Sequence, residues 1–498
     1  MAGIITKFAR NSSLRHLKTK ILPGLRTLSS EASIKRVPSK NSISALVAII
    51  TDASKVVEAH YERAKLASPS ASGNHEAVPS LDTTESHPLD GQISSLELRT
   101  AIQTIEGACA QLSATVARPN HTMVNKFMGY FEAVCINIAL EFKIADLLQE
   151  KPEGMHISEI GERTGVEDLK IGRILRLLAT KHVFREVSEN VFANNRLSIQ
   201  LVSGNPMSSL GLHFSDEGVK VNVLLPDVLE DPDWGHSYSS SHTAFNKYTG
   251  YPGSMFDYYQ NDKPKGALSG ARLGLGMVGW GTACEDHAVI TEFPWKELGD
   301  GATVCDVGAG VGNITMQLAK AYPGLQLILQ DLPERVKQAR EDVWPRKCPE
   351  AIEQGRIKFV PIDFFSGPPI PGCNIYYLKN VIHNWSDADV IKIFSNVRVA
   401  MAPHSRVLIQ DYILQPASRL PEASDTAGSQ IAQAPEPLLP NFGSGRIRQY
   451  NLDIHMMTIL NSEERRLSDF IRLGEAAGLK FVKFWDIGDT GLVEYRLL

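Results

Sequence analysis

The chain has 498 residues, of which 43% are apolar and 21% charged, a composition typical of folded globular domains. This length exceeds what one hydrophobic core organises, so two or three domains are expected. The net charge of -5 excludes the basic field that binding to nucleic acid or to an acidic membrane requires. The longest apolar stretches fall far short of the roughly 20 residues that cross a bilayer. Neither nucleic acid nor a membrane is therefore expected as a partner.

The six cysteines are scattered along the chain without a Cys-x-x-Cys motif. This usage fits a reducing compartment and predicts no zinc site, so we expect a cytoplasmic protein. Residues 1–40 suggest a mitochondrial alternative, because their first part is basic, contains serines and has no acidic residue before Glu31. A transit peptide has this composition, and so does a disordered basic tail.

Residues 41–118 hold two helical patterns separated by a linker that is rich in Ser, Pro and Thr. The stretch over residues 123–150 then becomes dense in large apolar side chains such as Phe127 and Phe131. We expect it to form one or two mostly buried helices. The first helix, the linker and the second helix are expected over residues 42–65, 67–91 and 92–116.

Residues 119–205 show the order of a winged helix: a helix, a turn, a second helix and a short hairpin. This order invites a DNA-binding interpretation. However, apolar residues such as Ile171, Leu175 and Leu178 occupy most of the second helix, and acidic residues offset the nearby bases. We therefore predict a dimerisation domain. Its helix, turn, second helix and two strands are expected at residues 157–164, Gly165, and residues 169–181, 183–187 and 191–193.

Residues 206–290 are mostly helical, and we expect them to form a linker and part of a substrate pocket. Over residues 291–498, strand and helix patterns alternate, which predicts an α/β domain with a Rossmann-like, mostly parallel sheet. The last two strands are close enough in sequence to form an antiparallel hairpin, and residues 415–445 are predicted to be an inserted surface loop. The strands are expected at residues 303–307, 326–330, 358–361, 375–378, 406–411, 480–485 and 491–497.

A glycine-rich turn joins the first of these strands to a helix. Gly308, Gly310 and Gly312 are spaced Gly-x-Gly-x-Gly, and Asn313 stands where the dinucleotide fingerprint requires its third glycine. Glycines let the backbone approach a ligand closely, and the helix that follows offers free N–H groups to an anionic group. The departure from the dinucleotide pattern favours S-adenosylmethionine.

The five strands of the predicted parallel sheet each end in a polar residue. In an open α/β sheet, ligands bind beyond the carboxyl ends of the strands. Asp331 is suited to accept both hydroxyls of a ribose, and Phe364 would provide an aromatic wall for adenine. The series predicts a nucleoside-containing cofactor. The polar residues are, in chain order, Asp306, Asp331, Asp363, Lys379 and Asp411.

Three segments carry a family resemblance. Residues 377–387, which include His383, resemble the signature around the catalytic histidine of caffeate/hydroxyindole-type O-methyltransferases. Residues 452–466, which include Glu464, are similar to a second motif of that family. The glycine loop resembles the first motif of class I S-adenosylmethionine-dependent methyltransferases. The resemblance covers roughly residues 120–498 and looks most like fungal members that modify polyketides or other aromatic metabolites.

The resemblance implies a catalytic trio of His383, Asp411 and Glu464. An imidazole is suited to take the proton of a phenol, and carboxylates then stabilise the imidazolium. Asp411 replaces the glutamate of many plant members and is one methylene shorter, and Asn384 replaces a frequent aspartate. Contacts to S-adenosylmethionine are expected from Asp306, Gly308, Gly310, Asp331, Asp363, Phe364 and Lys379.

Methionine and aromatic side chains clasp flat rings, so several of them are candidates for the acceptor pocket. The alternative is that they belong to the core. They are Met123, Phe127, Phe245, Met277, Trp280, His455 and Met456.

Together these features predict an S-adenosylmethionine-dependent O-methyltransferase that acts, without a metal, on a phenolic hydroxyl of an aromatic small molecule. A homodimer is expected through the N-terminal helices. The alternatives are a winged-helix DNA-binding regulator with an S-adenosylmethionine-sensing domain, a catalytically silent scaffold, and an enzyme of the same fold that methylates nitrogen or carbon.

Overall fold

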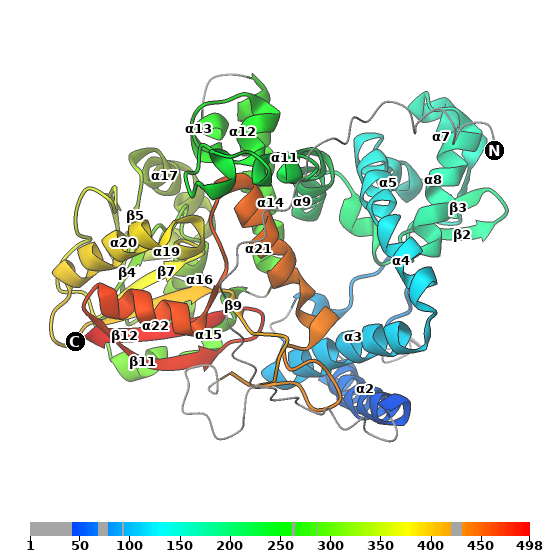
Figure 1. Ribbon diagram of the computed structural model, residues 1–498. Helices are drawn as coiled ribbons and strands as arrows, with labels where there is room; N and C mark the ends of the chain where they lie inside the picture. Colours follow the sequence, from blue (N-terminus) through cyan, green and yellow to red (C-terminus); the bar gives the residue numbers. More distant parts are fainter. Residues whose placement is uncertain (1–41, 68–77, 92–93, 261–263, 285, 420–430) are drawn as a thin grey trace, which may run out of the picture. The chain divides into compact units, whose positions relative to one another are not determined.

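The structure is a computed structural model that describes residues 42–67, 78–91, 94–260, 264–284, 286–419 and 431–498 (Figure 1). The basic segment at the N-terminus lies outside the described residues, and so do parts of the predicted linker and of the inserted loop. Within the described part, no helix combines the length and the apolar character that crossing a membrane needs.

A seven-stranded sheet forms the centre of the C-terminal half (Figure 1). Its order is β11-β12-β8-β7-β4-β5-β6, with β4 to β8 parallel and the β11–β12 hairpin antiparallel. The seven predicted strands and the expected terminal hairpin are confirmed. The strands are β4 (Thr303–Val307), β5 (Gln326–Asp331), β6 (Ile357–Pro361), β7 (Ile375–Lys379), β8 (Arg406–Asp411), β11 (Leu479–Asp486) and β12 (Gly491–Leu497).

Helices cover both faces of this sheet (Figure 1). In β7, Tyr376 belongs to an apolar cluster that includes residues of α20 (Asp387–Ala400) and α22 (Leu467–Ala476). The next residue, Tyr377, belongs to a second cluster that includes residues of α16 (Asn313–Ala321). Successive side chains of a strand point to opposite faces, so a sheet that is covered twice needs nearly continuous apolar strands. This requirement explains why the strand patterns were clear in the sequence.

The strand order reverses beside β4. The chain proceeds from β4 through β5 to β6 on one side, and then returns to β7 on the other side of β4. At such a reversal the connecting loops diverge, and open α/β sheets bind ligands there, beyond the carboxyl ends of the strands. The loops after β4 and β7, which carry Gly308 and His383, therefore lie at the same edge of the sheet, where the strand order reverses.

The helices before the winged helix differ from the prediction. Residues 123–150 contain three helices, α4 (Pro119–Phe127), α5 (Tyr130–Glu141) and α6 (Ile144–Gln149), rather than one or two. The prediction that this stretch is mostly buried is wrong for α4, which has no buried residue and exposes 67% of Phe127. Apolar density in a sequence indicates that a surface will be covered, but it does not indicate which molecule covers it.

The winged helix itself has the predicted elements. Helix α8 (Asp168–Thr180) follows α7 (Ile157–Thr164) and is packed inward through Ile171, Leu175 and Leu178, each 0% exposed. The hairpin pairs with a short additional strand in a three-stranded sheet of order β1-β3-β2. These strands are β1 (Met155–His156), β2 (Arg185–Ser188) and β3 (Val191–Ala193).

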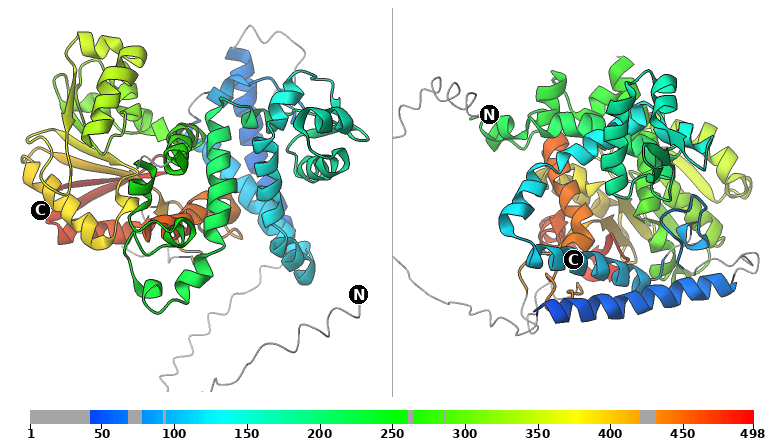
Figure 2. Two further views of the ribbon diagram at one scale, coloured as in Figure 1. Left: turned by 90° about the horizontal axis from the view of Figure 1, so that it is seen from above. Right: turned by 90° about the vertical axis from the view of Figure 1, so that its right-hand side faces the viewer.

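Two N-terminal helices, α2 (Ser42–Ala67) and α3 (Leu96–Val116), lie side by side, as Figure 2 shows. Both were predicted. Leu46 of α2 and Ala108 of α3 form an apolar cluster with Leu438 and Phe442. Both of these residues lie inside the predicted surface loop, so the prediction of a surface position is wrong for this part, which is buried against the two helices. The two helices thus pack against a segment that is distant from them in the sequence.

Candidate active site

The loop after β4 depends on glycine. Gly308 has a φ of +76° and Gly312 a φ of +84°, a left-handed conformation that side chains with a Cβ atom rarely adopt. A methyl group at Gly308 would lie 2.7 Å from Cγ2 of Val381 and 3.6 Å from Cε1 of Phe364. The loop therefore passes close to the segments that follow β7 and β6, and it brings two of the predicted cofactor residues together.

Asp331 at the end of β5 is held against this loop. Its Oδ2 accepts a hydrogen bond from the amide of Gly310 at 2.7 Å, and its Oδ1 accepts one from the amide of Leu332 at 2.7 Å. Burial raises the pKa of Asp331, and these two donors oppose the rise. A carboxylate has about four acceptor positions, so Asp331 retains capacity for the hydroxyl groups of a ligand.

Asp306 lies beneath the glycine loop. It is 3% exposed and accepts a hydrogen bond from the Thr315 hydroxyl in α16. Burial raises the pKa of Asp306 to about 7, and the Thr315 hydrogen bond opposes this rise. This hydrogen bond fastens the end of β4 to α16 just before and after the glycine loop.

Asp363 and Phe364 follow β6 at the same edge of the sheet. The exposed Asp363 carboxylate accepts hydrogen bonds from the Ser366 hydroxyl and from the Phe365 amide, the latter at 2.9 Å. These hydrogen bonds, that of Ser366 first, lower the pKa of Asp363, so it remains ionised. The half-buried ring of Phe364 lies edge-on to Trp385, with 6.0 Å between the ring centroids.

His383 and Glu464 form a hydrogen-bonded pair beyond the end of β7. His383 lies in the short 3-10 helix η8 (Ile382–Asn384), and its Nδ1 is 2.7 Å from Oε1 of Glu464. The Glu464 side chain is 0% exposed and the His383 side chain 12% exposed. Because the carboxylate accepts from Nδ1, Nε2 is the nitrogen that remains to take a proton from a ligand.

Two hydrogen bonds fix the position of the segment that carries Glu464. The amide of Glu464 donates to Oδ1 of Asp453 at 2.9 Å, and Asp453 lies in α21 (Ile447–Leu460). The buried guanidinium of Arg465 donates to the carbonyl oxygen of Ile382 at 3.1 Å. Sequence reasoning missed Asp453 and Arg465, because their contacts join segments whose proximity no local pattern reveals.

Asp411, the last residue of β8, is buried near this pair. It is 1% exposed, and neither carboxylate oxygen has a hydrogen-bond partner among the described residues. Burial raises the pKa of Asp411 to about 7, while the charge of His383 lowers it and that of Glu464 raises it. The short aspartate side chain therefore acts on His383 through its charge.

Four influences determine the pKa of His383. Burial lowers it, but the Glu464 carboxylate, by charge and hydrogen bond, together with the charge of Asp411, outweighs burial. Lys379 at the end of β7 opposes the rise, and the resulting pKa is about 9. The ring is thus a stronger base than a free imidazole. Since His383, Glu464, Asp411 and Lys379 interact, titration steps observed in experiments belong to the cluster rather than to one residue.

The predicted acceptor residues fall into two groups. The first lies in or against one buried apolar cluster next to α21, and within it Phe245 is 0% exposed and packs as core. The second is exposed to solvent on α4 and on α14 (Pro264–Ala283). The first group is Phe245, Trp280 and Met456, with His455 beside it. The second group is Met123, Phe127 and Met277, which are 45%, 67% and 41% exposed.

A further segment packs on His455 that the sequence did not reveal. His213 and Phe214 begin the π-helical turn η3 (His213–Gly218), and their rings lie 5.4 Å and 4.9 Å from the ring of His455. In the sequence these residues belong to a stretch that is merely helical in pattern. A π-helical turn has no sequence signature, although such turns are frequent at functional sites.

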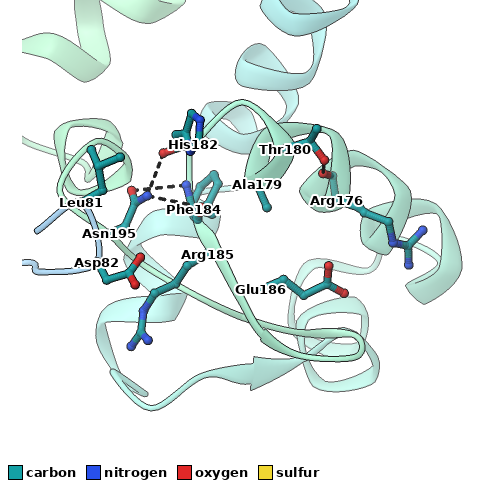
Figure 3. Close-up of a pocket in the computed structure, with 10 residues that line it drawn as sticks. All are labelled: Leu81, Asp82, Arg176, Ala179, Thr180, His182, Phe184, Arg185, Glu186 and Asn195. Atoms are coloured by element: carbon teal, nitrogen blue, oxygen red, sulfur yellow. Dashed lines mark hydrogen bonds between the residues drawn. The ribbon is translucent and has the colours of Figure 1, made fainter.

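The winged helix presents charges of both signs. A cavity of about 360 Å³ lies there. Figure 3 shows that Arg176 and Arg185 line it together with Asp82 and Glu186. Asn195 in this cavity donates its amide hydrogen to the carbonyl oxygen of Phe184 and accepts from its amide. Phosphate-binding surfaces are basic, so this arrangement favours a structural interpretation.

Comparison with known protein families identifies both halves of the chain. Residues 125–204 match the O-methyltransferase dimerisation domain, and residues 242–480 match the O-methyltransferase domain. The chain belongs to the O-methyltransferase family, and it is an S-adenosylmethionine-dependent O-methyltransferase of the α/β class.

Two fungal relatives illustrate the similarity. The 3-O-methyltransferase 2 of Phanerochaete chrysosporium is 42% identical over 461 residues, which cover 92% of this chain and 98% of that protein. The O-methyltransferase tpcA of Aspergillus fumigatus is 35% identical over 425 residues, which cover 79% of this chain and 86% of that protein.

Solved structures share the fold. The mitomycin 7-O-methyltransferase MmcR superposes with a TM-score of 0.58 at 23% identity, covering 78% of this chain and 99% of that one. LepI in complex with S-adenosylmethionine superposes with a TM-score of 0.63 at 19% identity, covering 80% of this chain and 94% of that one. At these identities the likeness concerns the fold.

Proposed function

We propose that this enzyme transfers a methyl group to a phenolic hydroxyl of an aromatic small molecule of fungal secondary metabolism, with His383 as the general base. The observation that carries the proposal is the His383–Glu464 pair: Nδ1 is held at 2.7 Å by a fully buried carboxylate, and the ring is partly accessible. A phenol has a pKa near 10 and is a weak nucleophile until its proton leaves. A base with a pKa of about 9 is well matched to that proton.

The residues around the glycine loop fit S-adenosylmethionine. A Cβ atom at Gly310 would meet no atom within 4 Å, so the loop has open space on that side. Asp331 retains acceptor positions for the ribose hydroxyls, and the Phe364 ring beside Gly308 provides a flat apolar wall for the adenine ring. Asp363 follows β6 and Lys379 ends β7, and both lie at the same edge of the sheet. When bound, the cofactor supplies an electrophilic methyl group on a positively charged sulfur.

The residues of the cluster would act in one step. Nε2 of His383 would take the phenolic proton, which makes the acceptor oxygen a nucleophile toward the methyl group that the bound cofactor would supply. Glu464 holds the ring through Nδ1 and stabilises the imidazolium, and Asp411 adds a second negative charge. This route requires no metal.

The test is His383→Ala, compared with wild type on labelled S-adenosylmethionine and a panel of simple phenols and aromatic polyketides. Calorimetry should show that the cofactor still binds, whereas turnover should fall by roughly 10² or more. His404→Ala, at an exposed histidine in the loop before β8, is the matched control and should retain wild-type turnover. Near-normal turnover of His383→Ala would remove this residue from the mechanism. Product analysis would identify the methylated atom as oxygen, nitrogen or carbon.

We also propose that the enzyme is a homodimer assembled through α4 and α5. Phe127, Met128, Tyr130 and Phe131 are 67%, 54%, 57% and 40% exposed in the single chain. All four fall within the segment that matches the dimerisation domain. A contiguous exposed apolar surface of this kind marks an interaction site, and a second copy of the chain would cover it.

A further inference from the structure

Two buried imidazoles lie outside the His383 cluster. His213 in η3 and His455 in α21 are 5% and 6% exposed, and their rings meet edge to face with 5.4 Å between centroids. Nε2 of His455 is buried and has no hydrogen-bond partner among the described residues. Native proteins seldom leave a buried polar atom unpaired, and such an atom calls for an explanation, such as a hydrogen bond made only when a ligand is present.

A series of aromatic rings connects His455 with the strand that carries Asp411. The ring of Phe214 is 4.9 Å from that of His455 and 5.8 Å from that of Trp280. The ring of Trp280 is in turn 6.2 Å from that of Tyr412, which directly follows Asp411 in the chain. The rings are inclined to one another by 45° to 77° and form an apolar wall with Nε2 of His455 at one end and the strand that carries Asp411 at the other.

Both imidazoles of this region are neutral near pH 7. Burial lowers the pKa of His455 to about 3, and the charge of His213 contributes to this. Burial also lowers the pKa of His213, although Glu217 opposes the shift. A neutral imidazole has one nitrogen that donates and one that accepts. It can therefore bind a hydroxyl, an ether or a carbonyl oxygen.

The charges close to the pair are unfavourable for an acidic ligand. Oε1 of Glu217 lies 3.8 Å from Nδ1 of His213, and this carboxylate accepts hydrogen bonds from the hydroxyls of Tyr259 and Ser269, the latter at 2.7 Å. The cations of the neighbouring turns are engaged elsewhere. Asp216 forms ion pairs with Lys220 and Arg272.

We propose that His455, with Phe214 and Trp280, recognises a second, uncharged oxygen on the acceptor ring. This inference rests on the function proposed above and names the substrate class. The substrates are neutral aromatic molecules that bear a hydroxyl, ether or carbonyl oxygen besides the hydroxyl that is methylated. Aromatic carboxylates are poor acceptors, because they would meet two neutral rings and the Glu217 carboxylate.

The experiment compares acceptors of equal shape with the purified full-length enzyme. The three methoxyphenols carry a second oxygen, and the three ethylphenols replace it by a methylene group. For at least one pair of isomers, wild type should show a KM about 3- to 10-fold lower for the methoxyphenol, the worth of one hydrogen bond. In His455→Leu the KM values of the two phenols should become equal, and kcat should change little. His455→Gln keeps an uncharged hydrogen-bonding group and should restore part of the ratio.

A second comparison tests the charge. The methyl ester of 4-hydroxybenzoate should have a KM at least about tenfold lower than that of the free acid, since a like charge near a buried carboxylate is strongly disfavoured. His404→Ala, the exposed control, should preserve both ratios. Wild type that methylates phenols while His455→Leu leaves every ratio of the KM values unchanged would overturn this inference but not the proposed function. Equal KM values for the acid and the ester would do the same. If wild type binds the cofactor and methylates no phenol, the proposed function fails and the inference fails with it.

Discussion

The carboxyl edge of the C-terminal sheet and the winged helix each carry a motif that suggests a ligand, but only the first presents groups for one. At the sheet edge, Asp331 retains acceptor capacity and His383 keeps Nε2 available. In the winged helix, α8 packs its apolar residues into its own domain, and the cavity that Arg176 and Arg185 line also contains Asp82 and Glu186. The comparison teaches that a motif indicates a fold, whereas function depends on which groups the fold leaves unsatisfied.

The glycine loop offers the largest effect apart from that of His383→Ala. Gly308→Val would place a branched side chain at a φ of +76° and 2.7 Å from Val381. Backbone strain of about 1–3 kcal/mol would displace the loop and weaken cofactor binding by roughly tenfold to a hundredfold. Calorimetric titration with S-adenosylmethionine measures this. Gly367→Ala, where a Cβ meets nothing within 4 Å, is the control. An unchanged affinity of Gly308→Val would show that the loop does not touch the cofactor.

Glu464→Gln should change both rate and pH dependence. In wild type, kcat/KM should rise with pH, because the base form of His383 appears as pH passes its pKa of about 9. Removing the negative charge of Glu464 removes the main influence that raises this pKa, so the rising limb should move to lower pH. Turnover should fall by about tenfold or more, part of what general base catalysis contributes.

Glu463→Gln is the matched control for this prediction, because it removes the adjacent carboxylate, whose side chain is 57% exposed. Its pH profile should coincide with that of wild type. If Glu464→Gln left the rising limb in place, the carboxylate would not be the partner that determines the basicity of the imidazole.

The dimer surface is testable without assaying activity. Phe127→Asp places a charge in the exposed apolar surface of α4 and should shift the enzyme from dimer toward monomer in analytical ultracentrifugation. Val399→Asp, at a residue of α20 that is 65% exposed, should leave the mass unchanged. A monomeric wild type, or a dimer that is insensitive to Phe127→Asp, would show that this surface has another partner.

For DNA binding by the winged helix we expect no effect at all. Because the net charge is -5 and acids accompany the bases of the winged helix, a gel-shift assay with generic DNA should show no complex at physiological salt. A salt-sensitive shift would revive the regulator hypothesis and would remove the contrast between the two regions.

Fold and site differ in how much of each was predictable. The strands were predictable because a doubly covered sheet forces apolar runs, and the turn at Gly308 because few other residues adopt its backbone conformation. The exposure of Phe127 could not be predicted, because a residue that a partner buries and a residue that its own chain buries show the same sequence pattern. The contacts of His213 with His455 were not predictable either, because no local rule joins η3 to α21.

The sequence by itself determined where the strands lie along the chain, the glycine loop and the identity of the polar groups at the strand ends. These features depend on local periodicity and backbone conformation, which neighbouring residues determine. Only the tertiary structure decided that Glu464 holds Nδ1 of His383, that Asp411 accepts no hydrogen bond from the described residues, and that Asp306 binds Thr315 of α16. The physical reason is that hydrogen bonds and charge interactions depend on distances of a few ångströms between segments far apart in the chain. Those distances exist only after the sheet and its helices have packed.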